Sequence, residues 1–357
     1  MVHLLHFTLL VSAVLCQDPI PSIIDDLNNI IRGIPPYIGD CSTTVVLRSN
    51  LRFTLYNQNN LQNGIVLDDT NIQEVNSALR LILIIHSWLQ NDSKGWVIEM
   101  KRVYLSNTNA NIVSVDWSPY AQINYGAAVC AVPLVAKFVS DLIYNITSGN
   151  PTWLNNTQIN GYSLGAHIAG IAGQEVQSKT NGLKLGRINS LDAAGPGFIN
   201  ITKNSRLDSQ DAWFVQGIHT SDDRFGYGPP YGTVDFRVNK VLQSCGSAQV
   251  GCPANPGVAI NANDNVFQQR LPALFCDTIR AVAYFNESIN SLNFLGIKCS
   301  NCASFTPNML LRQCGSSQTT IMGENCPLNV AGEYYLTTND NNPFAKGLQG
   351  TQGVLIV

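Results

Sequence analysis

The 357-residue chain has few charged side chains and only five histidines. Asp, Glu, Lys and Arg make up 13% of it, about half the share of roughly 25% found in ordinary soluble domains. The formal net charge is −3, and no block of Lys or Arg occurs. Nucleic-acid binding needs a basic face that neutralises phosphates, so nucleic acid is excluded as the main partner. The same lack argues against a polybasic membrane anchor.

Apolar residues are plentiful by comparison, at 45% of the chain. This share supports a sizeable core and argues against wholesale disorder. The length fits one large α/β domain or two small ones. Because neither an internal repeat nor a separating linker occurs, we expect a single main domain.

The amino terminus carries a targeting signal. Residues 3–16, HLLHFTLLVSAVLC, form an apolar run of signal-peptide length, far short of the roughly 20 residues that span a bilayer. Val14 and Cys16 place small residues just before a cut at Gln17. We find no later stretch of transmembrane length. We therefore expect a signal peptide over 1–16 and a secreted, extracellular protein.

A leader, residues 17–40, follows the signal and precedes the main domain, residues 41–357. Apolar residues at 23, 24, 27, 30 and 31 predict a short amphipathic helix, which Ser22 opens and Gly33 ends. We expect this helix either to pack on the main domain or to be processed from it.

The chain has ten cysteines, and seven of them fall between residues 245 and 326. This density indicates a disulfide framework formed outside the cell. Zinc at Cys299 and Cys302 is disfavoured, because no second such pair and no histidine pair lies nearby. Removal of Cys16 with the signal leaves an odd number, and hence a free thiol or a bond to another chain. Five sequons for glycosylation support secretion: Asn91, Asn145, Asn155, Asn200 and Asn286.

From residue 41 onward, apolar strand-like segments alternate with helical ones. This alternation predicts an α/β fold whose parallel sheet is covered by helices on both faces. The predicted strands are 81–85, 111–116, 158–161, 187–191 and 213–219, and the predicted helices are 131–143 and the segment after Ser163. Residues 221–272 are rich in Gly, Pro and Asn and predict a loop.

A Gly-x-Ser-x-Gly pentapeptide, GYSLG over 161–165, lies between a predicted strand and a predicted helix. Such a turn exposes the hydroxyl of Ser163 and leaves the N–H of Leu164 free to stabilise an oxyanion. The pentapeptide also occurs by chance in chains rich in Gly and Ser. The small residues that follow, over 166–170, favour a nucleophile turn because they allow close helix packing.

Several motifs together resemble the pancreatic-lipase family. They are GYSLGAH at 161–167, NIVSVDW at 111–117, INSLD at 188–192, IHT at 218–220 and RAVAYFNES at 280–288. The likeness extends from about Cys41 to YYLTTN at 334–339, and it is nearest to an insect branch that includes phospholipase A1 enzymes and fly yolk proteins. It implies a single-domain α/β-hydrolase fold without the carboxy-terminal β-sandwich of the larger pancreatic enzymes. It also implies a Cys41–Cys130 disulfide.

Asp192 ends a predicted strand 29 residues after Ser163. A serine hydrolase needs its orienting acid at such a strand end. A capping or loop aspartate is the alternative, and the surrounding motif favours the triad acid. The resemblance places oxyanion-hole N–H groups at Leu164 and Trp88. The family usually has glycine where this chain has Ser87, so we expect Ser87 to strain or narrow the hole.

The general base is missing from its expected place. In the family it is a histidine two residues after a cysteine, in a pattern like Cys-Ser-His-x-Arg-Ala, and this chain reads CDTIRA over 276–281. Thr278 therefore occupies the base position, and threonine cannot accept a proton near neutral pH. In subtilisin, loss of one triad member costs on the order of 10⁶ in turnover.

Four other groups are candidates for a substitute base. His167 lies on a helix that runs away from the nucleophile, and His86 belongs to the oxyanion loop. Relatives with an intact triad carry both. His219 ends a neighbouring strand and stays open as a candidate. Asp277 is adjacent to Thr278, but its side chain should point away from that of Thr278.

The mouth of the site departs from the family pattern in further places. GTVDF over 232–236 and NKV over 239–241 stand where the family has Gly-His-x-Asp-Phe and Asn-Gly-Gly. Cys245 and Cys252 are separated by six residues. This spacing resembles the short lid of the phospholipase A1 branch, or is merely a disulfide-pinned loop.

Three functions are consistent with these residues. The first is a secreted, catalytically impaired lipase relative that binds a lipid or lipid-like ester, or acts as a yolk-like or interaction protein. The second is an active carboxylic ester hydrolase that uses Ser163 and Asp192 with an unconventional base. The third is a structural or storage protein without a ligand. We expect no cofactor, no metal and no nucleic acid, and we expect peripheral contact with lipid surfaces.

Overall fold

The computed structural model describes residues 23–58, 60, 63–222, 224–240, 248–253, 273–305, 314 and 318–352. The predicted signal peptide, the cut before Gln17 and the predicted lid cysteine Cys245 lie outside these residues.

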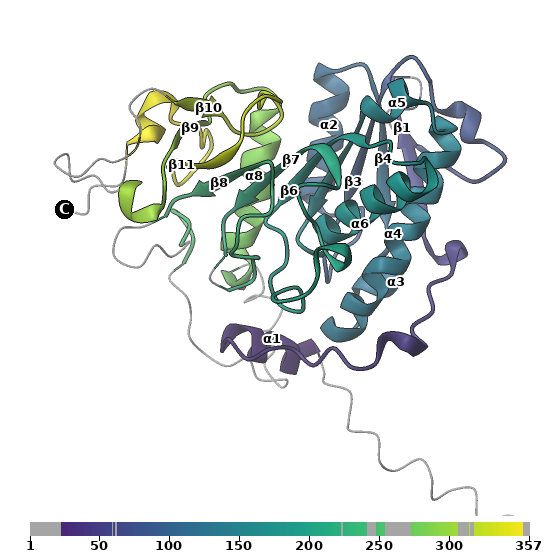
Figure 1. Ribbon diagram of the computed structural model, residues 1–357, viewed down its shortest axis with the longest axis horizontal. Coiled ribbons are helices and arrows are strands. Elements are labelled where there is room, and N and C mark those ends of the chain that lie inside the picture. The colour runs from purple at the N-terminus through teal and green to yellow at the C-terminus, as the bar shows by residue number, and fades with distance from the viewer. Residues whose placement is uncertain are drawn as a thin grey trace, which may run out of the picture.

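One 11-stranded sheet runs through the molecule in the order β10-β9-β11-β8-β7-β6-β5-β3-β4-β1-β2 (Figure 1). The strands from β4 to β11 in that order run parallel, while β1, β2, β9 and β10 add antiparallel edges. The bounds are β1 Arg52–Tyr56, β2 Ile65–Val66, β3 Arg80–Ile85, β4 Ala110–Asp116, β5 Thr157–Tyr162, β6 Leu185–Leu191, β7 Ala212–His219, β8 Val234–Val238, β9 Leu295–Lys298, β10 Thr319–Ile321 and β11 Gly332–Leu336.

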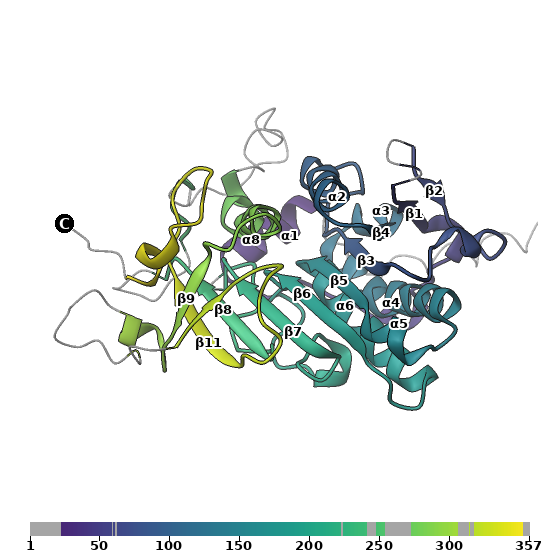
Figure 2. The same ribbon diagram turned by 90° about the horizontal axis from the view of Figure 1, so that it is seen from above.

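Helices cover both faces of this sheet, as the alternation of segments predicted (Figure 2). Helices α4 and α6 pack together on one face, and α2 and α8 pack together on the other, so that two separate apolar clusters form the core. The bounds are α1 Ile23–Ile31, α2 Gly95–Asn107, α3 Ser118–Ala121, α4 Tyr125–Thr147, α5 Pro151–Asn155, α6 Leu164–Lys179 and α8 Cys276–Ser288. The five predicted strands and the two predicted helices in the main domain are confirmed as β3 to β7, α4 and α6.

The prediction of loop over residues 221–272 is wrong at β8. This strand is buried along its whole length between β7 and β11. Its sequence, VDFRV, places two charged residues in the sheet, and each has a partner there: Asp235 lies 2.7 Å from His219, and Arg237 forms an ion pair with Asp222. Because these buried charged residues have partners on other elements, the strand lacks the apolar pattern by which a buried strand is recognised in a sequence.

Helix α4 corrects the statement that no later stretch has transmembrane length. Its 23 residues are long and apolar enough to cross a bilayer, with a mean hydropathy of 1.7 in the most apolar window. However, 67% of that window is buried inside the fold. A helix that is apolar on nearly all sides and packed on its neighbours is typical of a core helix as well.

The leader helix is present as α1, and it packs on the main domain. Leu27 is fully buried and Ile30 is 4% exposed, both within the larger apolar cluster. The Cys41–Cys130 disulfide implied by the resemblance is formed, and it fastens the residue directly after the leader to α4. Among the described cysteines, Cys326 is the one with a free thiol, and it is buried.

The two disulfides at opposite ends of the chain differ in the length of chain that they close. Cys41–Cys130 closes 89 residues and Cys299–Cys314 closes 15. A longer closed loop removes more entropy from the unfolded chain. We therefore expect loss of Cys41–Cys130 to lower the free energy of unfolding by about 1.5 kcal/mol more than loss of Cys299–Cys314. Urea unfolding of the two paired Cys→Ser variants measures this difference. Equal losses, or a larger loss for the shorter loop, would contradict the entropic account.

Candidate active site

The predicted nucleophile Ser163 occupies a sharp turn between β5 and α6. Its φ is 54° and its ψ is −113°, a left-handed conformation that costs free energy for any residue except glycine. Close backbone contacts explain the flanking glycines. A Cβ on Gly161 would lie 2.4 Å from the oxygen of Gly165, and a Cβ on Gly165 would lie 2.4 Å from the oxygen of Ile85. The pentapeptide is therefore held between β5, α6 and the end of β3.

The two predicted oxyanion donors flank this turn. The N–H of Leu164 begins α6, and the N–H of Trp88 belongs to the turn after β3. Within the described part of the chain, neither N–H donates to a protein acceptor. The Trp88 indole is fixed by a 2.7 Å hydrogen bond to the oxygen of Ile123. The expected strain does not fall on Ser87, because the positive φ in this turn is at Leu89, at 57°.

A pocket of about 380 Å³ opens above Ser163. It brings Ser163, Trp88 and Thr278 together, although the three come from different parts of the chain. The walls are mostly aromatic or aliphatic, including Tyr162, Trp96, Phe225, Phe275 and Ile279. An apolar pocket with a few convergent polar groups at one end is the usual form of a small-molecule site.

The predicted acid, Asp192, lies at the end of β6 and is 2% exposed. Its Oδ1 accepts the N–H groups of Thr220 and Ser221 at 2.8 and 2.9 Å, and its Oδ2 accepts the Ser221 hydroxyl at 2.5 Å. The nearby Thr278 hydroxyl also favours the charged form of this carboxylate. Burial raises the pKa of Asp192, and these hydrogen bonds oppose that rise. Asp192 is therefore saturated by donors without any histidine.

Thr278 lies in the first turn of α8 and is 3% exposed. Its hydroxyl, acting as a hydrogen-bond donor, opposes the rise that burial causes in the pKa of Asp192 and of Tyr162. Thr278 therefore lies close both to Asp192 and to the Ser163 pocket. A threonine hydroxyl cannot accept a proton near neutral pH, so Thr278 cannot act as a base there.

The ring nitrogens of His219 are not free to serve Ser163 as a base in this arrangement. Its Nε2 lies 2.7 Å from Asp235 Oδ1, and its Nδ1 lies 3.1 Å from Nη1 of Arg237. Because an arginine can only donate, Nδ1 must accept, and the ring proton is on Nε2 facing Asp235. Both ring nitrogens are occupied, and the imidazole is 1% exposed.

The other two described histidines are also occupied by structural contacts. His167 donates from Nε2 to the oxygen of Ala194 at 2.8 Å and accepts the N–H of Leu207 on Nδ1. Burial lowers its pKa to about 3, and its ring stacks on Phe198. His86 lies between the oxygen of Ser87, 2.9 Å away, and Asp116.

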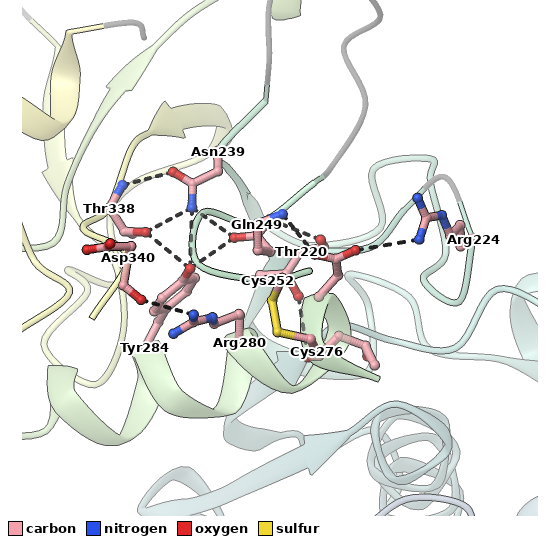
Figure 3. The surroundings of a disulfide bond; sticks show 12 residues. Thr220, Arg224, Asn239, Gln249, Cys252, Cys276, Arg280, Tyr284, Thr338 and Asp340 are labelled. Atoms are coloured by element: carbon pink, nitrogen blue, oxygen red, sulfur yellow. Dashed lines mark hydrogen bonds and ion pairs between the residues drawn. A yellow bond between two sulfur atoms is a disulfide. The ribbon is translucent and has the colours of Figure 1, made fainter. Parts of the chain in front are cut away.

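Asp277 points away from the site, as expected. Its Oδ1 accepts the N–H of Gln249 at 2.8 Å, and its Oδ2 lies 3.8 Å from Arg224 (Figure 3). The Gln249 side chain in turn bonds to Asn239 and to the phenol of Tyr284. The segment before α8 is therefore fastened to the helix that carries Thr278.

The inference of a short lid from the Cys245–Cys252 spacing is corrected by the disulfide that Cys252 forms. Cys252 pairs with Cys276, 24 residues along the chain, at the first residue of α8 (Figure 3). The loop closed by this bond is longer than the six-residue interval. The spacing of cysteines alone could not reveal this, because connectivity depends on which segments meet in space.

Three contributors to the site were missed in the sequence. Ser221 binds Asp192 with both its N–H and its hydroxyl, and it directly follows the IHT motif, so the neighbouring match was an available signal. Tyr162 stands in the variable position of the pentapeptide, which carries no signal of a contact with Thr278. Ile30 of α1 lines the pocket, and the helical pattern of the leader reveals that it is buried but not what it covers.

Residues 42–344 match the family model described as Lipase. The chain belongs to the pancreatic-lipase family. The mostly parallel sheet, the turn at Ser163 and the covering helices are accordingly those of an α/β-hydrolase fold.

Curated relatives in this family include enzymes and one protein named as inactive. Pancreatic triacylglycerol lipase of Mus musculus is 31% identical over 314 residues, which is 83% of this chain and 65% of that protein. Inactive pancreatic lipase-related protein 1 of Canis lupus familiaris is 29% identical over 85% of this chain and 66% of its own length. Phospholipase A1 member A of Rattus norvegicus is 33% identical over 68% of this chain and 49% of its own length. The chain spans less than two thirds of the length of each.

The turn at Ser163 provides a test of close packing with an internal control. Gly165→Ala would press a Cβ against two carbonyl oxygens, so we expect the free energy of unfolding to fall by about 3 kcal/mol. Gly95 is also near the start of a helix, but a Cβ there would meet no atom within 4 Å, so Gly95→Ala should be neutral or stabilising by up to about 1 kcal/mol. Denaturant unfolding compares the two. Similar stabilities would refute the packing argument.

The depressed pKa of His167 predicts a specific acid lability. The unfolded chain binds a proton on this ring below pH ~6.5, whereas the folded chain does so only near pH 3, so stability is lost as the pH falls between these values. The expected contribution is about 1.4 kcal/mol per pH unit in that window. His167→Gln should lower the free energy of unfolding at neutral pH. It should also make the fall of that free energy with decreasing pH shallower, by about 1.4 kcal/mol per pH unit. Parallel slopes in urea titrations from about pH 6 to pH 4 would show that His167 is not responsible.

Proposed function

We propose that this chain is a secreted, catalytically impaired member of the lipase family that binds a lipid or lipid-like ester in the Ser163 pocket. The observation that carries the proposal is that no base stands beside Ser163 among the described residues. Thr278 occupies the base position, and none of the described histidines has a ring nitrogen free to serve Ser163.

Catalysis by such a site is expected to be very slow. A serine hydroxyl needs a neighbouring base to take its proton, and a threonine hydroxyl does not titrate in the useful range. In subtilisin, loss of the base lowers turnover by about six orders of magnitude. The remaining assistance would come from the two free N–H groups and from binding.

Binding does not depend on the missing base. The aromatic walls of the pocket suit an acyl chain, and the free N–H groups of Trp88 and Leu164 suit an ester carbonyl at its polar end. Lipases and a phospholipase A1 among the relatives support a lipid ester as the ligand class. A yolk-like or interaction role, with peripheral contact to lipid surfaces, is compatible with this binding.

Secretion is part of the proposal. The apolar run over 3–16, with a signal peptide over 1–16, would direct the chain outside the cell, and the disulfides would be stable there. Three sequon asparagines are exposed, which supports a glycoprotein: Asn145, Asn155 and Asn200. We propose residues 17–40 as the leader and 41–357 as the lipase-like domain.

A second candidate, slow ester hydrolysis, is favoured by one observation. The strained turn at Ser163 and both free N–H groups are intact, although binding alone does not require the strain. In that case a group other than the described histidines would supply the base.

The decisive experiment restores the base. Thr278 lines the open pocket beside Ser163, so Thr278→His places an imidazole between Ser163 and Asp192. We expect hydrolysis of a p-nitrophenyl ester and of phosphatidylcholine to rise by at least about a hundredfold, the usual contribution of a positioned general base. Thr278→Gln, a polar side chain of similar size without a base, is the matched control. The Ser163→Ala change in the Thr278→His background should abolish the gain.

The unmodified chain decides between the candidates. Activity that disappears on Ser163→Ala alone would overturn the proposal of impaired catalysis and favour the second candidate. Lipid extracted from the purified native chain and identified by mass spectrometry would support binding. An empty pocket, with no uptake of added lipid, would favour a structural or storage role.

A further inference from the structure

The leader helix α1 lies below the main domain, at the end of the sheet where the parallel strands finish (Figure 1). Two contacts fix it there. The carboxylate of Asp26 accepts the backbone N–H of Tyr125 at 2.7 Å, at the start of α4, and Leu27 is buried in the core. Burial raises the pKa of Asp26. The helix is therefore held as part of the fold, although it precedes the lipase-like domain.

Two cavities meet at this helix. The Ser163 pocket, of about 380 Å³, is bounded on one side by Ile30 and Pro196. A second cavity of about 480 Å³ lies beyond the same two residues. Among the described lining residues, Ile30 and Pro196 are the ones that the two cavities share. They form the partition between a chamber that holds Ser163 and one that does not.

The second cavity is largely apolar near the partition. Its walls include Ile34, Pro35, Pro36, Ile38 and Ile199. Two charged residues, Asp222 and Arg224, are also at its wall. Asp222 is already paired with Arg237 and Lys240, and Arg224 lies 3.8 Å from the carboxylate of Asp277. The space beyond Ile30 therefore suits a continuation of an alkyl chain.

Tyr125 joins the two halves of the partition. Its backbone N–H holds Asp26 of α1, and its phenol donates to the oxygen of Pro196 at 2.8 Å. The same ring packs edge-on against Trp88 in the Ser163 pocket, with centroids 5.0 Å apart. Ile30 and Pro196 are thus positioned relative to each other and to the site by one side chain.

We propose that Ile30 is a specificity-determining residue, which ends the Ser163 pocket and so limits the length of the acyl chain that it accepts. This inference rests on the proposed lipid binding at the same site. Pro196 contributes the opposite half of the partition, but its backbone is tied to Tyr125. The Ile30 side chain is the part that can be shortened without changing the turn at Ser163.

Fatty acids of increasing length test the partition. Saturated acids from octanoate to stearate would compete with dansyl-undecanoic acid for the unmodified chain, for Ile30→Ala and for Ile30→Phe. Each further buried methylene raises affinity about fourfold. If Ile30→Ala joins the cavities, its ratio of stearate to laurate affinity should rise about tenfold or more above that of the unmodified chain. Ile30→Phe should lower the ratio.

The control is Ile31→Ala, the same truncation on the same helix at a residue that lines neither cavity. Its chain-length profile should match that of the unmodified chain, and thermal unfolding would confirm that all variants remain folded. If Ile30→Ala and Ile31→Ala give the same profile as the unmodified chain, the role of Ile30 is overturned while lipid binding stands.

The remaining outcomes separate the two proposals. If the unmodified chain binds no acid but Ile30→Ala does, Ile30 still limits the pocket, and the native lipid ligand is short or absent. If neither binds any acid, lipid binding and the role of Ile30 both fail.

Discussion

The left-handed turn at Ser163 is the constraint on which the site depends. It is possible because two glycines let α6 approach the ends of β3 and β5 to backbone contact. That approach places the predicted nucleophile, the N–H of Leu164 and the turn with Trp88 around one point. The apolar clusters on both faces of the sheet hold the elements together and compensate for the strain. The geometry of a hydrolase therefore persists independently of which side chain stands at the base position.

Asp192 shows how a buried carboxylate at such a site is kept stable. A buried carboxylate without partners is costly. Here three donors from Thr220 and Ser221 bind its two oxygens, and the nearby Thr278 hydroxyl also favours the charged form. The carboxylate therefore needs no histidine partner to be stabilised in the fold.

Much of the fold could be predicted from the sequence. The strands β3 to β7 are buried along almost their whole length, and their alternation with helical segments is typical of a parallel sheet covered on both faces. Strand β8 could not be predicted in this way, because Asp235 and Arg237 are satisfied by residues on other elements. A contact between residues that are distant in the sequence produces no hydrophobic periodicity in either segment, so the sequence pattern does not reveal it.

The same reasoning applies to the site. The positions of Ser163, Asp192 and Thr278 followed from short motifs, and the structure places Ser163 and Thr278 at one pocket, with Asp192 close to Thr278. The saturation of Asp192 by Ser221 and the pairing of Cys252 with Cys276 did not follow, because both depend on how loops meet. That Ile30 lines the pocket could also be found only from the structure, because it depends on where α1 packs.

The position of α1 has a consequence for how this site can diverge. The turn at Ser163, the N–H groups of Leu164 and Trp88 and the Asp192 carboxylate lie at the ends of strands in the central sheet, where a substitution disturbs many neighbours. Ile30 lies on a separate helix that contributes one wall from outside. A change in the shape of the pocket at Ile30 can therefore arise without altering the residues around Ser163.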